Sequence, residues 1–213
     1  PLTMADARAV CEVMADLQRV EIGSVDIEEA DIIGDWPQPS GDVEAVTMGV
    51  FSGDRLVGYA EAARDGHCDA AVHPQWHGRG IGTALARWMQ DRSRELGATV
   101  VGMPVPAGKS GDRLLEGLGC RVRWTSWVLQ LPQGHTIPER PPPADYGVRE
   151  ARPAEYRTVH EVIEEAFGEW AERDPKPFED FEAGVIERPG FEPWQVRVVE
   201  GPDGIVGAAV LIM

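Results

Sequence analysis

The chain has 213 residues, 43% of them hydrophobic and 26% charged, which is typical of a globular protein with one large domain or two small ones. Its 36 acidic and 20 basic residues give a net charge of −16, which argues against nucleic acid or an anionic membrane as the main partner. No apolar run approaches the roughly 18 residues of a membrane span, and no signal-peptide pattern opens the chain, so no membrane association is expected.

Two further features of composition indicate the compartment and the source. The three cysteines, Cys11, Cys68 and Cys120, are odd in number and far apart, which predicts free thiols in a reducing cytoplasm. Only Lys109 and Lys176 are lysines, and this bias toward arginine hints at a GC-rich bacterial genome. The chain starts at a proline, which suggests a trimmed or partial chain.

Hydrophobic periodicity predicts the elements of the first part of the chain. Apolar residues at helical spacing predict a helix over 3–20, with Thr3 as its N-cap. The elements that follow are an acidic helix or loop over 26–35, strands over 44–51, 55–63 and 67–73, a helix over 81–96, a strand over 99–104, a helix over 110–118, and a last strand or hairpin over 122–131. The order of these elements predicts an α/β (α+β) fold, a mixed sheet flanked by helices.

Two sequence patterns recur at one offset. The pattern A-x4-V-x-E-V starts at Ala5 and again at Ala154, and the pattern D-x2-V-G-x-A starts at Asp54 and again at Asp203, so both shifts are 149 residues. The shared register without gaps indicates a duplicated unit of about 150 residues.

The repeat and the prolines divide the chain. A first domain is predicted over 1–131, a proline-rich linker over 132–145, and the front half of a second copy over 146–213. The second copy opens with a predicted strand at 146–150 and a helix over 153–168. It is expected to be partial, because it has no counterpart of the glycine-rich stretch at 72–85.

The stretch VHPQWHGRGIGTAL, residues 72–85, places three glycines between a strand and a helix. Such glycines let a ligand approach the backbone at the amino end of a helix. The dinucleotide fingerprint G-x-G-x-x-G/A fails here in both registers, because Thr83 or Leu85 occupies its sixth position. The sequence GKS at 108–110 suggests a P-loop, but five residues rather than four separate it from Gly102. A glycine-rich helix entry without a ligand is a further alternative.

The spacing Gln75-x-x-Gly78-x-Gly80 resembles the pyrophosphate loop Q/R-x-x-G-x-G/A of the GNAT superfamily of N-acetyltransferases. The element order over 1–131 and the sequence RLLEGLGC at 113–120 extend this resemblance. The duplicated unit is similar to tandem GNAT proteins, of which mycothiol synthase is one.

The resemblance implies acetyl-CoA as the cofactor. Its diphosphate would lie on loop and helix amides, and its pantetheine arm would pair with the strand before the loop. The implied cofactor-binding residues are Ala71, Val72, His73, Gln75, Gly78, Arg79, Gly80, Ile81, Gly82 and Thr83.

Catalysis requires a base that takes a proton from the amine, directly or through water. Glu61 and Asp69, on neighbouring predicted strands, are the first two candidates, and Glu44 is the third; each is alternatively a solvated strand residue. Many family members carry Asn and Tyr where this chain has Gly108 and Leu115, so the usual general acid is absent. The thiolate is a fair leaving group without it, since a thiol pKa lies near 8.5.

The histidines His67, His73 and His77 do not form a spacing typical of a metal site, so no metal is expected.

The sequence therefore predicts an acyltransferase that moves acetyl from acetyl-CoA to a small-molecule or peptide amine by direct attack. The acceptor is expected near an acidic group between the first two helical segments, Glu28, Glu29, Asp31 and Asp35. The main alternative is a non-catalytic CoA-binding or structural half of a tandem protein, and a weaker one is a protein-interaction module with a vestigial loop. A homodimer is left open.

Overall fold

The computed structural model describes residues 1–36, 42–169 and 175–211. The chain divides into two compact units: the first comprises Pro1–Cys120 and Lys176–Phe191, and the second comprises Arg121–Pro175 and Glu192–Met213. The last two residues of the predicted second copy lie outside the described residues. Within the described ranges, no helix is long and apolar enough to cross a membrane.

The first unit is built on an antiparallel sheet of three strands, β1 (Thr47–Ser52), β2 (Arg55–Ala62) and β3 (Cys68–Val72), in the order β1-β2-β3. β1 and β2 form the predicted hairpin, and Gly53 in its turn has a φ of 60°, which favours glycine. β3 follows in register, with Gly58 opposite Val72 and Ala62 opposite Cys68.

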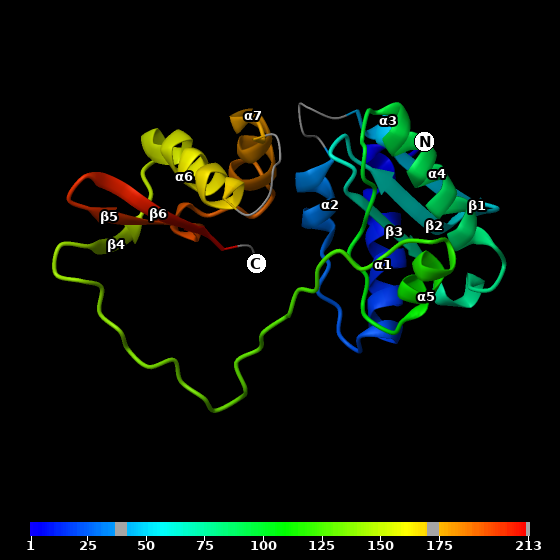
Figure 1. Cartoon of the computed structure of the whole chain (residues 1–213), viewed down its shortest axis with the longest axis horizontal. Coiled ribbons are helices and arrows are strands. Elements are labelled where there is room, and N and C mark those ends of the chain that lie inside the picture. The colour runs from blue at the N-terminus through cyan, green and yellow to red at the C-terminus, as the bar shows by residue number, and fades with distance from the viewer. Residues whose placement is uncertain (37–41, 170–174, 212–213) are drawn as a thin grey trace. The chain divides into compact units, whose positions relative to one another are not determined.

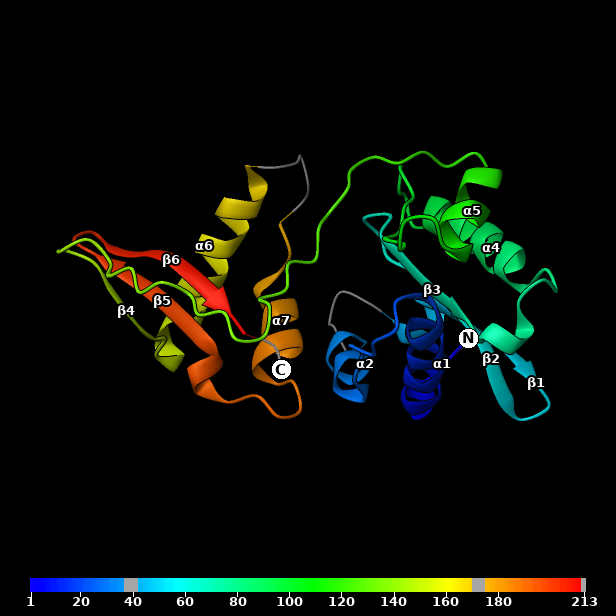
Figure 2. The same ribbon diagram turned by 90° about the horizontal axis from the view of Figure 1, so that it is seen from below.

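Helices cover both faces of this sheet (Figure 2). One face carries α1 (Ala7–Glu21) and α2 (Glu29–Asp35), and the other carries α4 (Ile81–Glu95) and α5 (Ser110–Gly117). Side chains alternate between the faces of a strand, so Tyr59 packs toward α1 while Ala60 packs toward α4. This mixed α/β architecture confirms the predicted fold class.

The start of α1 follows from its sequence. The Asp6 carboxylate accepts hydrogen bonds from the backbone amide of Thr3 at 2.8 Å and from its hydroxyl at 3.0 Å. A 3₁₀ turn, η1 (Met4–Asp6), leads into the helix. The residues at helical spacing, Ala7, Val10 and Val13, are buried against the sheet, as the apolar periodicity predicts.

The first strand begins later than the sequence predicted. Residues Val43–Val46 form a helical turn, α3, because the Asp42 carboxylate caps it by accepting from the amide of Glu44 at 3.1 Å. Glu44, the third candidate base, therefore lies on this turn and not on a strand.

Two predicted strands of the first domain are wrong. The segment over 99–104 meets the sheet only at a parallel bridge between His67 and Gly102, where the Cys68 amide donates to the Gly102 carbonyl at 2.9 Å. Residues 122–131 have no strand structure, and Val128 is 99% exposed. Strand-forming side chains favour a strand only where a neighbouring strand supplies hydrogen-bond partners, and none pairs with 122–131 among the described residues.

The second unit has its own antiparallel sheet, β4 (Gly147–Glu150), β5 (Val196–Gly201) and β6 (Gly204–Val210), in the order β4-β5-β6. The helix α6 (Tyr156–Gly168) packs on it after the 3₁₀ turn η3 (Pro153–Glu155), and η5 (Pro193–Gln195) precedes β5 (Figure 1).

The hairpin of the second unit repeats that of the first. Val196 pairs with Val210 as Thr47 pairs with Glu61, a shift of 149 residues on both strands. The irregularity in the ladder recurs at the same shift, between residues 50 and 51 in β1 and between residues 199 and 200 in β5. The sequence offset therefore holds at the level of strand register.

Candidate functional site

The glycine-rich turn connects β3 to α4. After the 3₁₀ turn η2 (Pro74–Trp76), Gly78 has a φ of 73° and Gly80 a φ of 82°, both in the left-handed region. A Cβ atom at either position would meet nothing within 4 Å, so the space beside both glycines is open. The turn thus leaves its backbone accessible from outside.

The amides that follow this turn are available to a ligand. Gly80 is the N-cap of α4, and the first helical hydrogen bond runs from the Ala84 amide to the Gly80 carbonyl at 3.0 Å. The first amides of a helix have no acceptor within it. In the described chain, no backbone acceptor is paired with the amides of 78–83. Together with the positive end of the helix dipole, these amides suit a diphosphate.

Gly82 has a different role from the other two glycines. A Cβ atom there would lie 3.0 Å from Cδ2 of Leu114, so its small size lets α4 approach α5. Arg79, the cation of the loop, stacks on the Trp76 ring at 4.3 Å and donates to the Gln75 carbonyl at 3.4 Å. It is exposed, which leaves its guanidinium accessible to an anion.

The side chain of His73 anchors the start of the loop, a role that the sequence did not indicate. His73 is 6% exposed, and its Nδ1 accepts from the Gln75 amide at 3.2 Å. Its Nε2 lies 3.2 Å from the carboxylate of Asp16 on α1 and 2.7 Å from a guanidinium nitrogen of Arg55 on β2. The imidazole therefore joins the loop to a helix and to the sheet.

The backbone of β3 has one side facing β2 and one side open. The His73 amide donates to the Val57 carbonyl at 3.0 Å, so His73 and Ala71 direct their amides toward β2. Val72 alternates with them and directs its amide to the open side. Its carbonyl accepts from Nε2 of His77 at 2.8 Å. Of the three residues whose amides the sequence assigned to the cofactor, only Val72 thus has its amide on the open side.

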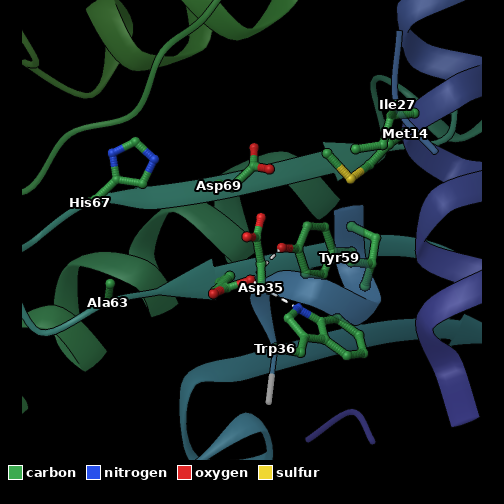
Figure 3. A pocket seen from close by; sticks show the side chains of 10 residues that line it. Met14, Ile27, Asp35, Trp36, Tyr59, Ala63, His67 and Asp69 are labelled. Carbon is green, nitrogen blue, oxygen red and sulfur yellow. Dashed lines mark hydrogen bonds between the residues drawn. The ribbon is translucent and has the colours of Figure 1, made fainter. Parts of the chain in front are cut away.

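A cavity of about 150 Å³ lies on the face of the sheet that α1 and α2 cover (Figure 3). Glu61 and Asp69, the first two candidate bases, both line it and sit directly opposite each other in the β2–β3 register. Glu44 does not line it. The other lining residues are Met14, Ile27, Ile32, Asp35, Trp36, Tyr59, Ala63 and His67.

Glu61 is fixed by two hydrogen bonds to one of its oxygens. Oε2 accepts from the Tyr59 hydroxyl at 2.7 Å and from the Trp36 indole nitrogen at 3.1 Å. Burial, followed by the charge of Glu61, raises the pKa of Tyr59 well above its ordinary value, so Tyr59 stays a hydrogen-bond donor. No donor to the second oxygen of Glu61 is found among the described residues, so that oxygen can accept a further hydrogen bond.

The two aspartates of the cavity hold protons more tightly than exposed aspartates. Burial raises the pKa of Asp69 against the lowering effects of the Ala70 amide and of His67. Burial and the charge of Glu61 raise the pKa of Asp35, which Arg188 lowers. Of the four acidic residues expected near the acceptor, only Asp35 lines the cavity, because the carboxyl end of α2 reaches it.

Comparison with known proteins finds a family similarity within the first unit. Residues 11–107 match the acetyltransferase (GNAT) family. This segment is similar to the acetyltransferase domains of that family. Acetyl-CoA, the cofactor that the sequence predicted, is the acetyl donor of this family. Among curated proteins, no sequence matches the chain.

Solved structures share the fold. A GCN5-related N-acetyltransferase from Sphaerobacter thermophilus is 23% identical with a TM-score of 0.64, over 97% of this chain and 69% of that one. A GCN5-related N-acetyltransferase from Kribbella flavida is 17% identical with a TM-score of 0.50, over 96% and 52% of the two chains. The N-myristoyltransferase of Saccharomyces cerevisiae, solved with myristoyl-CoA, is 19% identical with a TM-score of 0.50, over 84% and 47%.

Proposed function

We propose that this chain transfers the acetyl group of acetyl-CoA to an amine acceptor by direct attack of the amine. One juxtaposition carries the proposal: the open glycine turn with its unpaired amides and the cavity with its carboxylates both adjoin β3. A site for an anionic carrier and a site for an amine would thus share one strand.

The residues of the turn would hold the cofactor. The amides of 78–83 suit the diphosphate, the exposed Arg79 suits a charge-assisted contact to it, and the open amide of Val72 suits the amide groups of the pantetheine arm. Gln75 would contribute by holding the turn through its bond to His73. When bound, acetyl-CoA supplies an activated acetyl thioester.

The cavity would bind the acceptor and receive its proton. An alkylammonium cannot attack a carbonyl until it is deprotonated, and a carboxylate near it favours both binding and proton removal. We rank Glu61 first as the base, because two hydrogen bonds fix its carboxylate and one oxygen remains for the amine or a water. Asp69 ranks second; burial raises its pKa, so when ionised it is a stronger base than an exposed aspartate. The acceptor class is a small-molecule or peptide amine.

A titration followed by an activity panel tests this proposal. Acetyl-CoA is titrated into the chain by calorimetry, and a panel of amines is then assayed for acetyl transfer. Binding with turnover supports an N-acetyltransferase. Binding without turnover of any amine supports the alternative of a non-catalytic CoA-binding half. If acetyl-CoA does not bind, both the N-acetyltransferase and the CoA-binding half are contradicted, and the protein-interaction module is the alternative that is supported.

One residue favours the non-catalytic alternative. Leu115 on α5 stands where the sequence resemblance places a tyrosine that acts as the general acid, so this unit lacks that proton donor.

We propose further that the chain is part of a tandem arrangement, since β5 and β6 repeat β1 and β2 at a constant offset. Turnover by this chain, compared with a longer chain that continues the second repeat, tells whether the first unit is catalytic by itself. The three free cysteines fit our proposal that the protein works in the cytoplasm.

A further inference from the structure

A segment from inside the second repeat belongs to the first compact unit. Residues 176–191 follow α6 in the chain, yet they cluster with Pro1–Cys120. They contain α7 (Phe178–Phe181) and the π-helical turn η4 (Glu182–Ile186), and η4 packs against α2. The offset of 149 makes 178–184 the counterpart of α2 itself.

The segment 176–191 packs closely on α2 at Gly34. Glycine weakens a helix, and its presence inside α2 needs a reason. A Cβ atom at Gly34 would lie 3.3 Å from Cγ and 3.6 Å from Cδ of Arg188, and 3.6 Å from the Gly184 carbonyl oxygen. The aliphatic part of Arg188 therefore packs directly over the backbone of α2.

The charged end of Arg188 also binds α2. Its guanidinium forms an ion pair with Asp31, and the two side chains are only 10% and 23% exposed. A pair shielded from water in this way is more costly to break than an exposed one, because the remaining charge loses its partner. Arg188 thus holds α2 both by packing and by charge.

The position of α2 determines one end of the cavity. Asp35 ends the helix and Trp36 follows it; both line the cavity, and Trp36 donates to Glu61. Arg188 itself lowers the pKa of Asp35. We propose that Arg188 is a positioning residue, through which the segment 176–191 fixes α2 and so shapes the acceptor end of the cavity. The effect on acceptors rests on the proposed acetyl transfer, whereas the effect on α2 does not.

Hydrogen exchange and kinetics on the full chain test this role. In Arg188→Ala, amide exchange over 29–36 is expected to rise at least about tenfold, because α2 loses the packing and the ion pair that Arg188 supplies and opens locally more often. The KM for an amine found in the panel is expected to rise about fivefold to tenfold, with the Kd for acetyl-CoA unchanged. Arg188→Lys restores charge without the planar fork and should recover part of both effects.

Two further variants separate positioning from general damage. Arg8→Ala removes a matched arginine of an exposed ion pair on α1, with a side chain 77% exposed, and should leave α2 exchange unaltered. Gly34→Val brings a branched side chain into the space that the methylenes of Arg188 occupy, without removing the charge, and should raise α2 exchange in the same direction. Unchanged exchange over 29–36 in Arg188→Ala, or an equal rise in Arg8→Ala, overturns the proposal. If exchange over 29–36 rises in Arg188→Ala but the chain acetylates no amine, the role of Arg188 in holding α2 is supported. The proposed acetyl transfer is then contradicted.

Discussion

At the scale of single residues, the site depends on side chains held by others. The carboxylate of Glu61 receives two donors on one oxygen, from Tyr59 and Trp36, which come from different elements. A carboxylate held in this way has a fixed direction, which proton transfer requires.

Glu61→Gln keeps the shape of this side chain and removes the proton acceptor. If Glu61 is the base, turnover at neutral pH should fall by roughly 10²–10⁴, the usual contribution of a positioned base. Affinity for acetyl-CoA should barely change, and higher pH should recover part of the rate by deprotonating the amine in solution. The measurement is kcat against pH from 6 to 9. Turnover equal to that of the parent across this range would redirect attention to Asp69.

Gly80→Val tests the diphosphate site. A branched side chain would have to adopt a φ of 82° and would enter the open space beside the free amides. Binding of acetyl-CoA should be lost in calorimetry while the circular dichroism spectrum is retained. An unchanged affinity would show that the turn is not the cofactor site.

His73→Phe tests the anchor of the loop. The ring volume is kept, but the Gln75 amide loses its acceptor, and Asp16 loses a partner. We expect the affinity for acetyl-CoA to fall about tenfold, which corresponds to about 1.4 kcal/mol. His73→Asn should recover part of this affinity, since an asparagine side chain also caps an amide two residues on. Equal affinity in the parent and in His73→Phe would contradict the anchoring role.

At the scale of elements, local sequence patterns predicted the helices and the hairpin whose ends are set by residues next to them in the sequence. The helix after Thr3, the hairpin around Gly53 and the helix after Gly80 each have their own capping or turn residue, and all three form. The segment 122–131 has strand-forming residues but no paired neighbour, and its structure depends on partners that a local pattern does not specify. The same reason applies to the site, since the contact of His73 with Asp16 joins residues that are distant in sequence.

Two equivalent glycines of the repeated hairpins test how α4 packs on its sheet. Gly58 and Gly207 are separated by 149 residues, but a Cβ atom at Gly58 would lie 3.0 Å from Cγ2 of Ile81, whereas one at Gly207 would lie 3.5 Å from Val199. Gly58→Ala should therefore lower the free energy of unfolding by about 1 kcal/mol, and Gly207→Ala should change it by less than about 0.5 kcal/mol. Urea unfolding measures both. Equal effects would mean that α4 does not constrain the sheet at Gly58.

At the scale of the whole molecule, the two units place their carboxylates in opposite environments. In the first unit, burial raises the pKa of Asp69, so the charged form is disfavoured in the fold. In the second unit, Arg149 donates to Glu155 at 2.7 and 2.8 Å and to Glu200 at 2.8 Å. These bonds lower the pKa of Glu155 from 4.5 to about 2, and they lower that of Glu200. The acidic residues behind the net charge of −16 therefore do not all affect the stability of the fold in the same way.

Acidification should consequently affect the two units with opposite sign. Between the ordinary pKa of Asp69, 3.8, and its raised value in the fold, the folded chain binds more protons than the unfolded chain, so the first unit gains stability as pH falls through this window. Between 4.5 and about 2, the unfolded chain binds more protons at Glu155, so the second unit loses stability as pH falls.

Hydrogen exchange resolved by segment, followed from pH 7 to pH 3 with correction for the intrinsic exchange rate, measures the stability of both units. Asp69→Asn should flatten the response of β2 and β3, and Glu155→Gln should flatten that of β4 and β5. If the protection of both units falls in parallel with acidification, and neither variant alters its slope, the opposed burial and pairing of these carboxylates do not govern the stability of the chain.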